Sequence, residues 1–97
     1  MPTAKVLEVI DGKSLMIGPK WEHNDMAGFI LILKNVETPA RGEAGSNEAL
    51  NAHEKICTGK NISYEGDGID MHRRLIAEVS IKGVSVNETM RELGYAT

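Results

Sequence analysis

Apolar residues recur in short runs along the first third of the chain, in the pattern typical of β-strands. Ala4–Ile10 and Ser14–Ile17 are two such runs, and the Asp11-Gly12 step between them favours a tight hairpin turn. Phe29–Val36 is dense in large and β-branched apolar residues, which predicts a central strand buried on both faces. These segments predict three strands before any helix.

The polar and glycine-rich stretches between these runs predict where the chain turns. Gly18–Gly28 is polar and is predicted to be a loop, while Glu37–Gly45 contains a proline and two glycines and is predicted to be irregular. Further along, Lys60–Glu65 alternates polar and apolar positions, and Leu75–Ile81 does the same. Two more strands are therefore expected in the second half of the chain.

Two helices are predicted by their end signals. Ser46 is expected to cap a helix that runs to about Cys57, with Gly59 as its left-handed terminator. Ser85–Glu88 has the spacing of a capping box and opens a last helix, which carries apolar residues as far as Leu93 and stops at Gly94. The apolar stripe of the first helix consists of Ala49, Leu50, His53, Ile56 and Cys57.

The order β-β-β-α-β-β-α predicts an α+β domain, mainly β, with the layout of an OB-type five-stranded barrel and two packed helices. Its 97 residues suit one domain, residues 1–97. Phe29 and Tyr64 are expected in the core, His53 at its boundary, and the single cysteine, Cys57, buried. Trp21 is expected either in a mobile loop or folded onto the barrel.

Composition narrows the function classes. Eleven basic against fourteen acidic residues give a formal charge of −3, which is unfavourable for a nucleic-acid binder although it leaves room for a local basic patch. No segment has the pattern of a signal peptide, and Phe29–Leu33 is too short to span a bilayer. A soluble, cytoplasmic protein with no membrane partner is expected.

Three segments resemble the staphylococcal nuclease family. They are VIDGKSL at Val9–Leu15, LILKNVETPA at Leu31–Ala40, and the stretch from Arg73 to Thr97 that contains RRLIAEVS, a Lys-Gly turn and VNET. The resemblance implies an OB-fold barrel and Ca²⁺-dependent phosphodiester hydrolysis, in which two aspartates hold calcium, a glutamate activates water and two arginines stabilise the phosphate. The final C-terminal helix of the family is absent from this sequence.

Carried over position by position, most of that site is missing. The first calcium aspartate falls on Lys13 and the second on Glu37, while the general-base glutamate falls on Ala40. The strand arginine falls on Ile32 when the segments are aligned at Thr38-Pro39, or on Ile30 when they are aligned at Phe29. Arg74 alone matches a catalytic arginine.

These matches predict no calcium site and no other cofactor. Arg74 and Glu37 are the matched catalytic positions, and they are read either as remnants of a site or as a structural ion pair. Lys13, Ser14, His72 and Arg73 are candidate binding residues, since the hairpin lysine and the 72–74 cations can form a phosphate-binding patch or simply a solvated rim.

The leading hypothesis is a non-catalytic module that binds single-stranded nucleic acid or a protein partner. The alternative is a divergent phosphodiesterase that uses Ca²⁺ or another metal, with Arg74, Glu37 and a displaced base, Glu43. The acidic balance of the chain favours a protein partner over nucleic acid.

Overall fold

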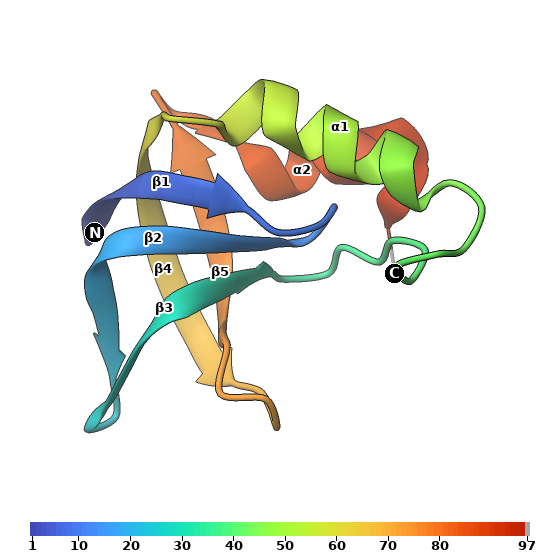
Figure 1. The fold of residues 1–97 in the computed structure, drawn as a ribbon. Helices are drawn as coiled ribbons and strands as arrows, with labels where there is room; N and C mark the ends of the chain where they lie inside the picture. Colours follow the sequence, from blue (N-terminus) through green and yellow to red (C-terminus); the bar gives the residue numbers. More distant parts are fainter. Residues whose placement is uncertain (97) are drawn as a thin grey trace.

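Five strands close into a barrel in the computed structural model, which describes residues 1–96 (Figure 1). The sheet runs in the order β3-β2-β1-β4-β5, and parallel pairing of β3 with β5, from Leu31 opposite Leu75 to Leu33 opposite Ala77, closes it. A short β6, Val84–Ser85, pairs with β5. The predicted OB-like α+β barrel is therefore confirmed. The barrel strands are β1 Thr3–Val9, β2 Ser14–His23, β3 Met26–Leu33, β4 Asn61–Ile69 and β5 Leu75–Ile81.

Both helices lie across one end of the barrel (Figure 1). Helix α1, Ser46–Cys57, connects β3 to β4; helix α2, Val86–Met90, continues into the π-helical turn η1, Arg91–Tyr95. The predicted start of α2 is confirmed: Ser85 is its cap, and Ser85 Oγ accepts a hydrogen bond from the Glu88 amide at 3.0 Å. The predicted cap of α1 is wrong: Ser46 is its first helical residue, and Gly45, with φ of 89°, takes the cap position without a side-chain bond.

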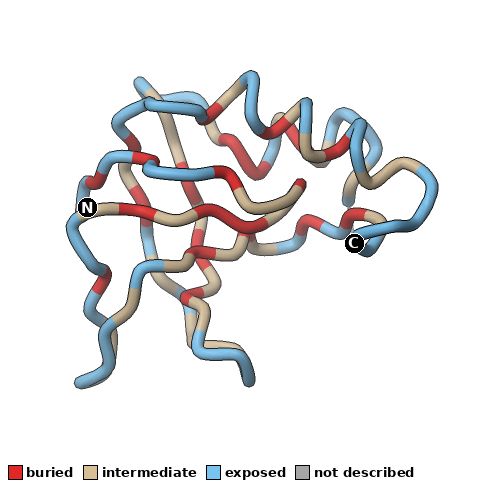
Figure 2. Tube along the Cα trace, viewed as in Figure 1, coloured by how far each residue is buried: buried red, intermediate tan, exposed pale blue. Residues whose placement is uncertain are grey.

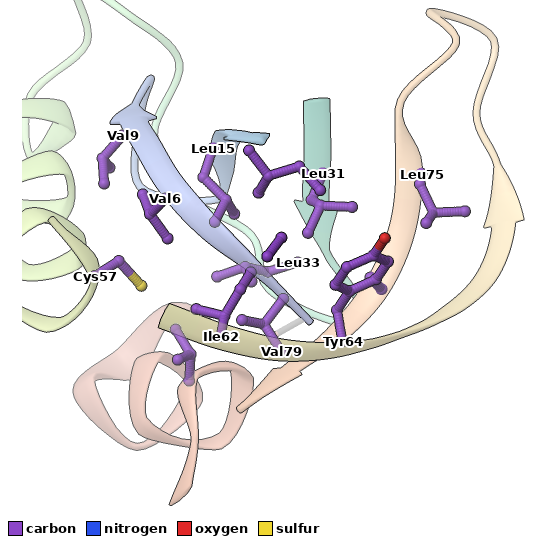
Figure 3. Packing of buried hydrophobic residues seen from close by; sticks show 14 of the residues in the cluster. Val6, Val9, Leu15, Leu31, Leu33, Cys57, Ile62, Tyr64, Leu75 and Val79 are labelled. Atoms are coloured by element: carbon purple, nitrogen blue, oxygen red, sulfur yellow. The ribbon is translucent and has the colours of Figure 1, made fainter. Parts of the chain in front are cut away.

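The core fills the barrel and the space below α1 (Figures 2 and 3). Tyr64 and Cys57 are buried as predicted, and burial raises the pKa of the Cys57 thiol to about 12, so it is no nucleophile at neutral pH. Phe29, by contrast, is 53% exposed. Strand β3 buries Leu31 and Leu33 but leaves Ile30 and Ile32, on its other face, partly exposed, because no second layer covers that face within residues 1–96. Phe29 shares the face of Leu31 and Leu33 but precedes the part of β3 that pairs with β5. The predicted doubly buried strand is therefore wrong.

A long β2–β3 hairpin replaces the loop predicted at Gly18–Gly28. The strands run on to His23 and Met26, and the pair is joined by two residues of positive φ, Asn24 (49°) and Asp25 (66°), as in a type I′ turn. Trp21 is buried and its Nε1 donates to the carbonyl of Ile30 at 2.9 Å. Trp21 is the only buried residue of Gly18–Gly28, and one apolar position among polar and turn-forming residues is too few to show the alternation that identifies a strand.

His53 connects α1 to the β1–β2 turn through a hydrogen bond. Its side chain is completely buried, deeper than the boundary position predicted, and its Nδ1 donates to the carbonyl of Asp11 at 2.8 Å. Beside it, a Cβ on Gly12 would lie 2.7 Å from the Ala49 Cβ, so only glycine permits this close approach. Burial lowers the pKa of His53, although the Asp11 carbonyl and the charges of Asp11 and Glu54 act in the opposite direction.

Acid is therefore expected to destabilise the fold through His53. Below the ordinary histidine pKa of 6.5, His53 is protonated in the unfolded chain but stays neutral in the folded chain. The free energy of unfolding therefore falls as the pH falls, by at most about 1.4 kcal/mol per pH unit. Urea denaturation between about pH 5 and about pH 8 measures this slope. His53→Gln should flatten it, whereas replacing the exposed His72 with glutamine should not; equal slopes in both variants would contradict the assignment.

Candidate binding cleft

An open cleft of about 390 Å³ lies among the β1–β2 turn, the chain following β3 and the β4–β5 turn. Ile32 and Ile76 are partly exposed and provide apolar surface in it, while Asn35 adds an amide. Beside the buried Leu33 and Val36, the lining has five charged residues: Lys13, Lys34, Glu37, Asp67 and Asp70. We refer to this feature as the cleft; it contains both matched calcium-ligand positions, Lys13 and Glu37.

One side of the cleft is an ion pair between Lys13 and Glu37. The carboxylate of Asp11 accepts hydrogen bonds from the amides of Lys13 and Ser14, at 2.9 and 2.8 Å, and so fixes the turn that presents Lys13. Lys13 Nζ then lies 2.9 Å from Glu37 Oε1. The Glu37 amide donates to the carbonyl of Tyr95 at 2.7 Å, which holds its backbone against the C-terminal segment.

The opposite side is organised by Asp70. Its Oδ2 accepts from Arg74 Nε at 2.7 Å, and its Oδ1 accepts from the amides of His72 and Arg74, both at 2.9 Å. Partial burial acts to raise the pKa of Asp70, but the hydrogen bonds from Arg74 and His72 outweigh it and hold the pKa below its usual value. Asp70 is therefore an ionised anchor for the turn and is unsuited to proton transfer near neutral pH.

Lys34 and Asp67 make a third ion pair, with Nζ 3.0 Å from Oδ2. Lys34 is placed by its backbone, since its amide donates to the carbonyl of Ala77 on β5 at 3.0 Å. Both side chains are well exposed, so the pair contributes about 0–1 kcal/mol to stability. Every lysine of the cleft is thus matched by a carboxylate at hydrogen-bonding distance.

The predicted pairing of Glu37 with Arg74 is wrong, because each has a different partner. Of the two readings of the 72–74 cations, the solvated rim fits the exposure of His72 and Arg73, which lie on the β4–β5 turn and do not line the cleft. Ser14 is only 1% exposed, so its hydroxyl is inaccessible to a ligand, contrary to its prediction as a binding residue. Of the candidate residues, only Lys13 and Glu37 line the cleft.

Neither Ala40 nor Glu43, the positions carried over for a general base, lines the cleft. Ala40 is an exposed loop residue, and Glu43, the candidate displaced base, is engaged locally because its Oε1 accepts from the Ala40 amide at 2.8 Å. Ile32, not Ile30, lines the cleft where the strand arginine would project. Within residues 1–96, no group of three or more His, Cys, Asp or Glu side chains is arranged to hold a metal ion.

Sequence reasoning missed Asp70, Asp67 and Lys34. The spacing of Asp70 and Arg74 offers a weak signal, since a carboxylate and guanidinium four residues apart can close a short turn. Lys34 and Asp67 are 33 positions apart in the chain; Lys34 follows β3, whereas Asp67 lies in β4. Only the closed barrel brings them together.

Comparison with known proteins adds no identification: neither the scan of protein-family models nor the search of curated proteins finds a match to this chain. In residues 1–96, no helix has both the length and the apolar character needed to cross a membrane.

Proposed function

We propose that this chain is a staphylococcal-nuclease-like domain that has no catalytic role and uses the cleft to bind a segment of a protein partner. The observation that carries the proposal is the pairing of charges in the cleft. Lys13 and Lys34 are each engaged by a carboxylate, and Arg74 at the adjacent turn is engaged by Asp70. Such a surface suits a partner that exchanges ion pairs with it.

Nucleic acid is the weaker candidate because its affinity comes from cations that neutralise phosphates. The cleft has two lysines against three carboxylates, and the whole chain is acidic. Nor does an aromatic side chain on which a base could stack line the cleft within residues 1–96; Phe29, exposed on β3, lies outside it.

Catalysis of the family type is disfavoured on chemical grounds. A positively charged Lys13 at a calcium-ligand position repels the ion, and an alanine at the position of the general base removes a contribution worth about 10²–10⁴ in rate. Glu37 retains a carboxylate but directs it to Lys13. These losses support a binding role for the fold over a divergent phosphodiesterase.

The chemistry of the cleft specifies the class of partner. A protein segment that carries both a basic and an acidic residue can replace the internal partners of Glu37 and Lys13, and an apolar side chain between them can cover Ile32 and Ile76. Fully burying one such side chain is worth about 1.5–3 kcal/mol. Because a millimolar dissociation constant corresponds to about 4 kcal/mol and a micromolar one to about 8 kcal/mol, weak binding, near the millimolar range, is expected.

Selection from a displayed peptide library, followed by calorimetry, tests the proposal. Selected peptides should bind the wild-type chain, and Glu37→Lys should weaken them at least about tenfold. Glu8→Lys is the matched control, because Glu8 is exposed on β1 outside the cleft lining. A short oligothymidylate should not bind at physiological salt; tight oligonucleotide binding with a steep salt dependence would contradict the proposed partner class.

A further inference from the structure

The β2–β3 hairpin extends away from the barrel as an arm (Figure 1). His23 and Met26 close its two-residue turn, and the closing pair of such a turn exchanges hydrogen bonds between its own backbone groups. Because the direction of backbone groups alternates along an antiparallel strand, Met26 and Gly28 face β2. The N–H and C=O groups of Ala27 and Phe29 therefore face the opposite edge of β3.

That edge has no strand beside it in the described part of the chain. Pairing of β3 with β5 begins only at Leu31, beyond the arm. The arm also exposes apolar side chains there, since Phe29 is 53% and Met26 39% exposed. Unpaired backbone groups next to exposed apolar side chains are the features through which strands of separate molecules join.

The two edges of the same arm are protected to different degrees. The outer edge of β2, beyond its last pairing with β1 at Gly18, carries Pro19, Lys20 and Glu22. Proline and charged side chains are the usual obstacles to pairing at an exposed edge. Strand β3, Met26–Leu33, contains neither a proline nor a charged residue, so its edge lacks such obstacles.

We propose that a second copy of this chain docks on this edge, with the two β3 strands antiparallel about a two-fold axis at Gly28. In this register Ala27 of each copy faces Phe29 of the other, so the outward N–H and C=O groups of both residues pair. Gly28 faces itself at the non-hydrogen-bonded position, where Cα atoms come within about 4.5 Å. Glycine suits this approach, and the small Ala27 accommodates the Phe29 ring.

A second copy is favoured over a foreign strand because the edge is self-complementary. Without a charge in Met26–Leu33, antiparallel pairing of two copies opposes no like charges across the strands. Two-fold pairing also uses one edge of each arm and leaves the protected β2 edges outside. The assembly therefore closes at a dimer and does not extend into a fibre.

Sedimentation from about 10 µM to about 1 mM, a range that detects weak association, tests the proposal. The wild type should pass from monomer to dimer. Ala27→Pro removes an outward N–H, and Phe29→Lys replaces the exposed ring with a charge; each should raise the dimer dissociation constant at least about tenfold. Leu7→Lys is the matched control, because Leu7 is 59% exposed on β1, outside this edge, and its replacement should leave dimerisation unchanged.

Circular dichroism establishes that each variant is folded, and Phe29→Lys decides the outcome if Ala27→Pro does not fold. A wild-type chain that stays monomeric throughout the range would overturn the proposal. Equal dimerisation by wild type and Phe29→Lys, an equal loss in Leu7→Lys, or open-ended growth would overturn it as well.

Discussion

Asn87→Ala should lower the free energy of unfolding by about 2–4 kcal/mol. The Asn87 side chain is fully buried at the start of α2, where its Oδ1 accepts from the Val79 amide at 2.9 Å. Its Nδ2 donates to the carbonyls of Ala77, at 2.9 Å, and Lys34, at 3.0 Å. Truncation removes all three bonds and leaves the Val79 amide without this partner.

The loss is limited because both carbonyls keep a second donor. The Lys34 amide also donates to Ala77, and Arg91 Nη1 donates to the Lys34 carbonyl. Urea denaturation measures the effect, with Asn51→Ala as the control because Asn51 is an exposed residue of α1. The control should change stability by no more than about 0.5 kcal/mol; equal effects of the two substitutions would show that Asn87 does not connect α2 to the barrel.

This connection also positions the cleft. Through the Lys34 carbonyl, Asn87 holds the chain that follows β3 against β5, and Lys34 is the residue that pairs with Asp67 across the cleft. The sequence predicts Asn87 only as an interior position of a capping box. Its burial and its three bonds depend on α2 packing beside β5, which no local pattern specifies.

The parts of the fold that could be predicted are those with local causes. Asp11-Gly12 forms the first hairpin turn because its carboxylate can bond the next amides, and Ser85 caps α2 by the same kind of bond. The β2–β3 arm escaped prediction because Trp21 is the only buried residue of Gly18–Gly28, which is too few for an alternating pattern. The apolar content of Phe29–Val36 likewise identifies a strand without revealing that its outer face is uncovered.

The charge pairs of the cleft could not be predicted for a different reason. The sequence offers Glu37 several possible basic partners. Which of them pairs with it depends on where separate segments of the chain place their side chains. Lys13 reaches it because the Asp11 turn directs that lysine toward the chain after β3. Arg74 instead pairs with Asp70, four residues away, and does not reach Glu37.

Three substitutions made together should create a calcium site at the edge of the cleft. Lys13→Asp, Ile32→Arg and Ala40→Glu together remove the repelling lysine and restore the residue types implied by the nuclease resemblance. A unit charge about 4 Å from a divalent ion costs up to about 8 kcal/mol at an effective dielectric of about 20, so removing Lys13 is the dominant change. Calorimetry should show calcium binding with a dissociation constant of about 10⁻⁴–10⁻³ M, as in weak protein sites.

A matched control tests whether position or charge is responsible. The control carries Ile32→Arg, Ala40→Glu and Lys5→Asp, and it keeps Lys13. Its net charge equals that of the first triple variant, but the changed lysine is at an exposed position of β1. This control should bind calcium no better than the wild type. Failure of the triple variant to bind calcium would contradict the alignment that places Lys13 and Ala40 at the missing ligand and base.

The most direct measurement is incubation of the wild-type chain with single-stranded DNA and RNA, with and without Ca²⁺, Mg²⁺ or Mn²⁺, beside an Arg74→Ala variant. The account predicts no metal-dependent cleavage by either protein, because we propose that the cleft, with its lysines paired to carboxylates, is a binding surface. Metal-dependent cleavage by the wild type that disappears in Arg74→Ala would contradict it.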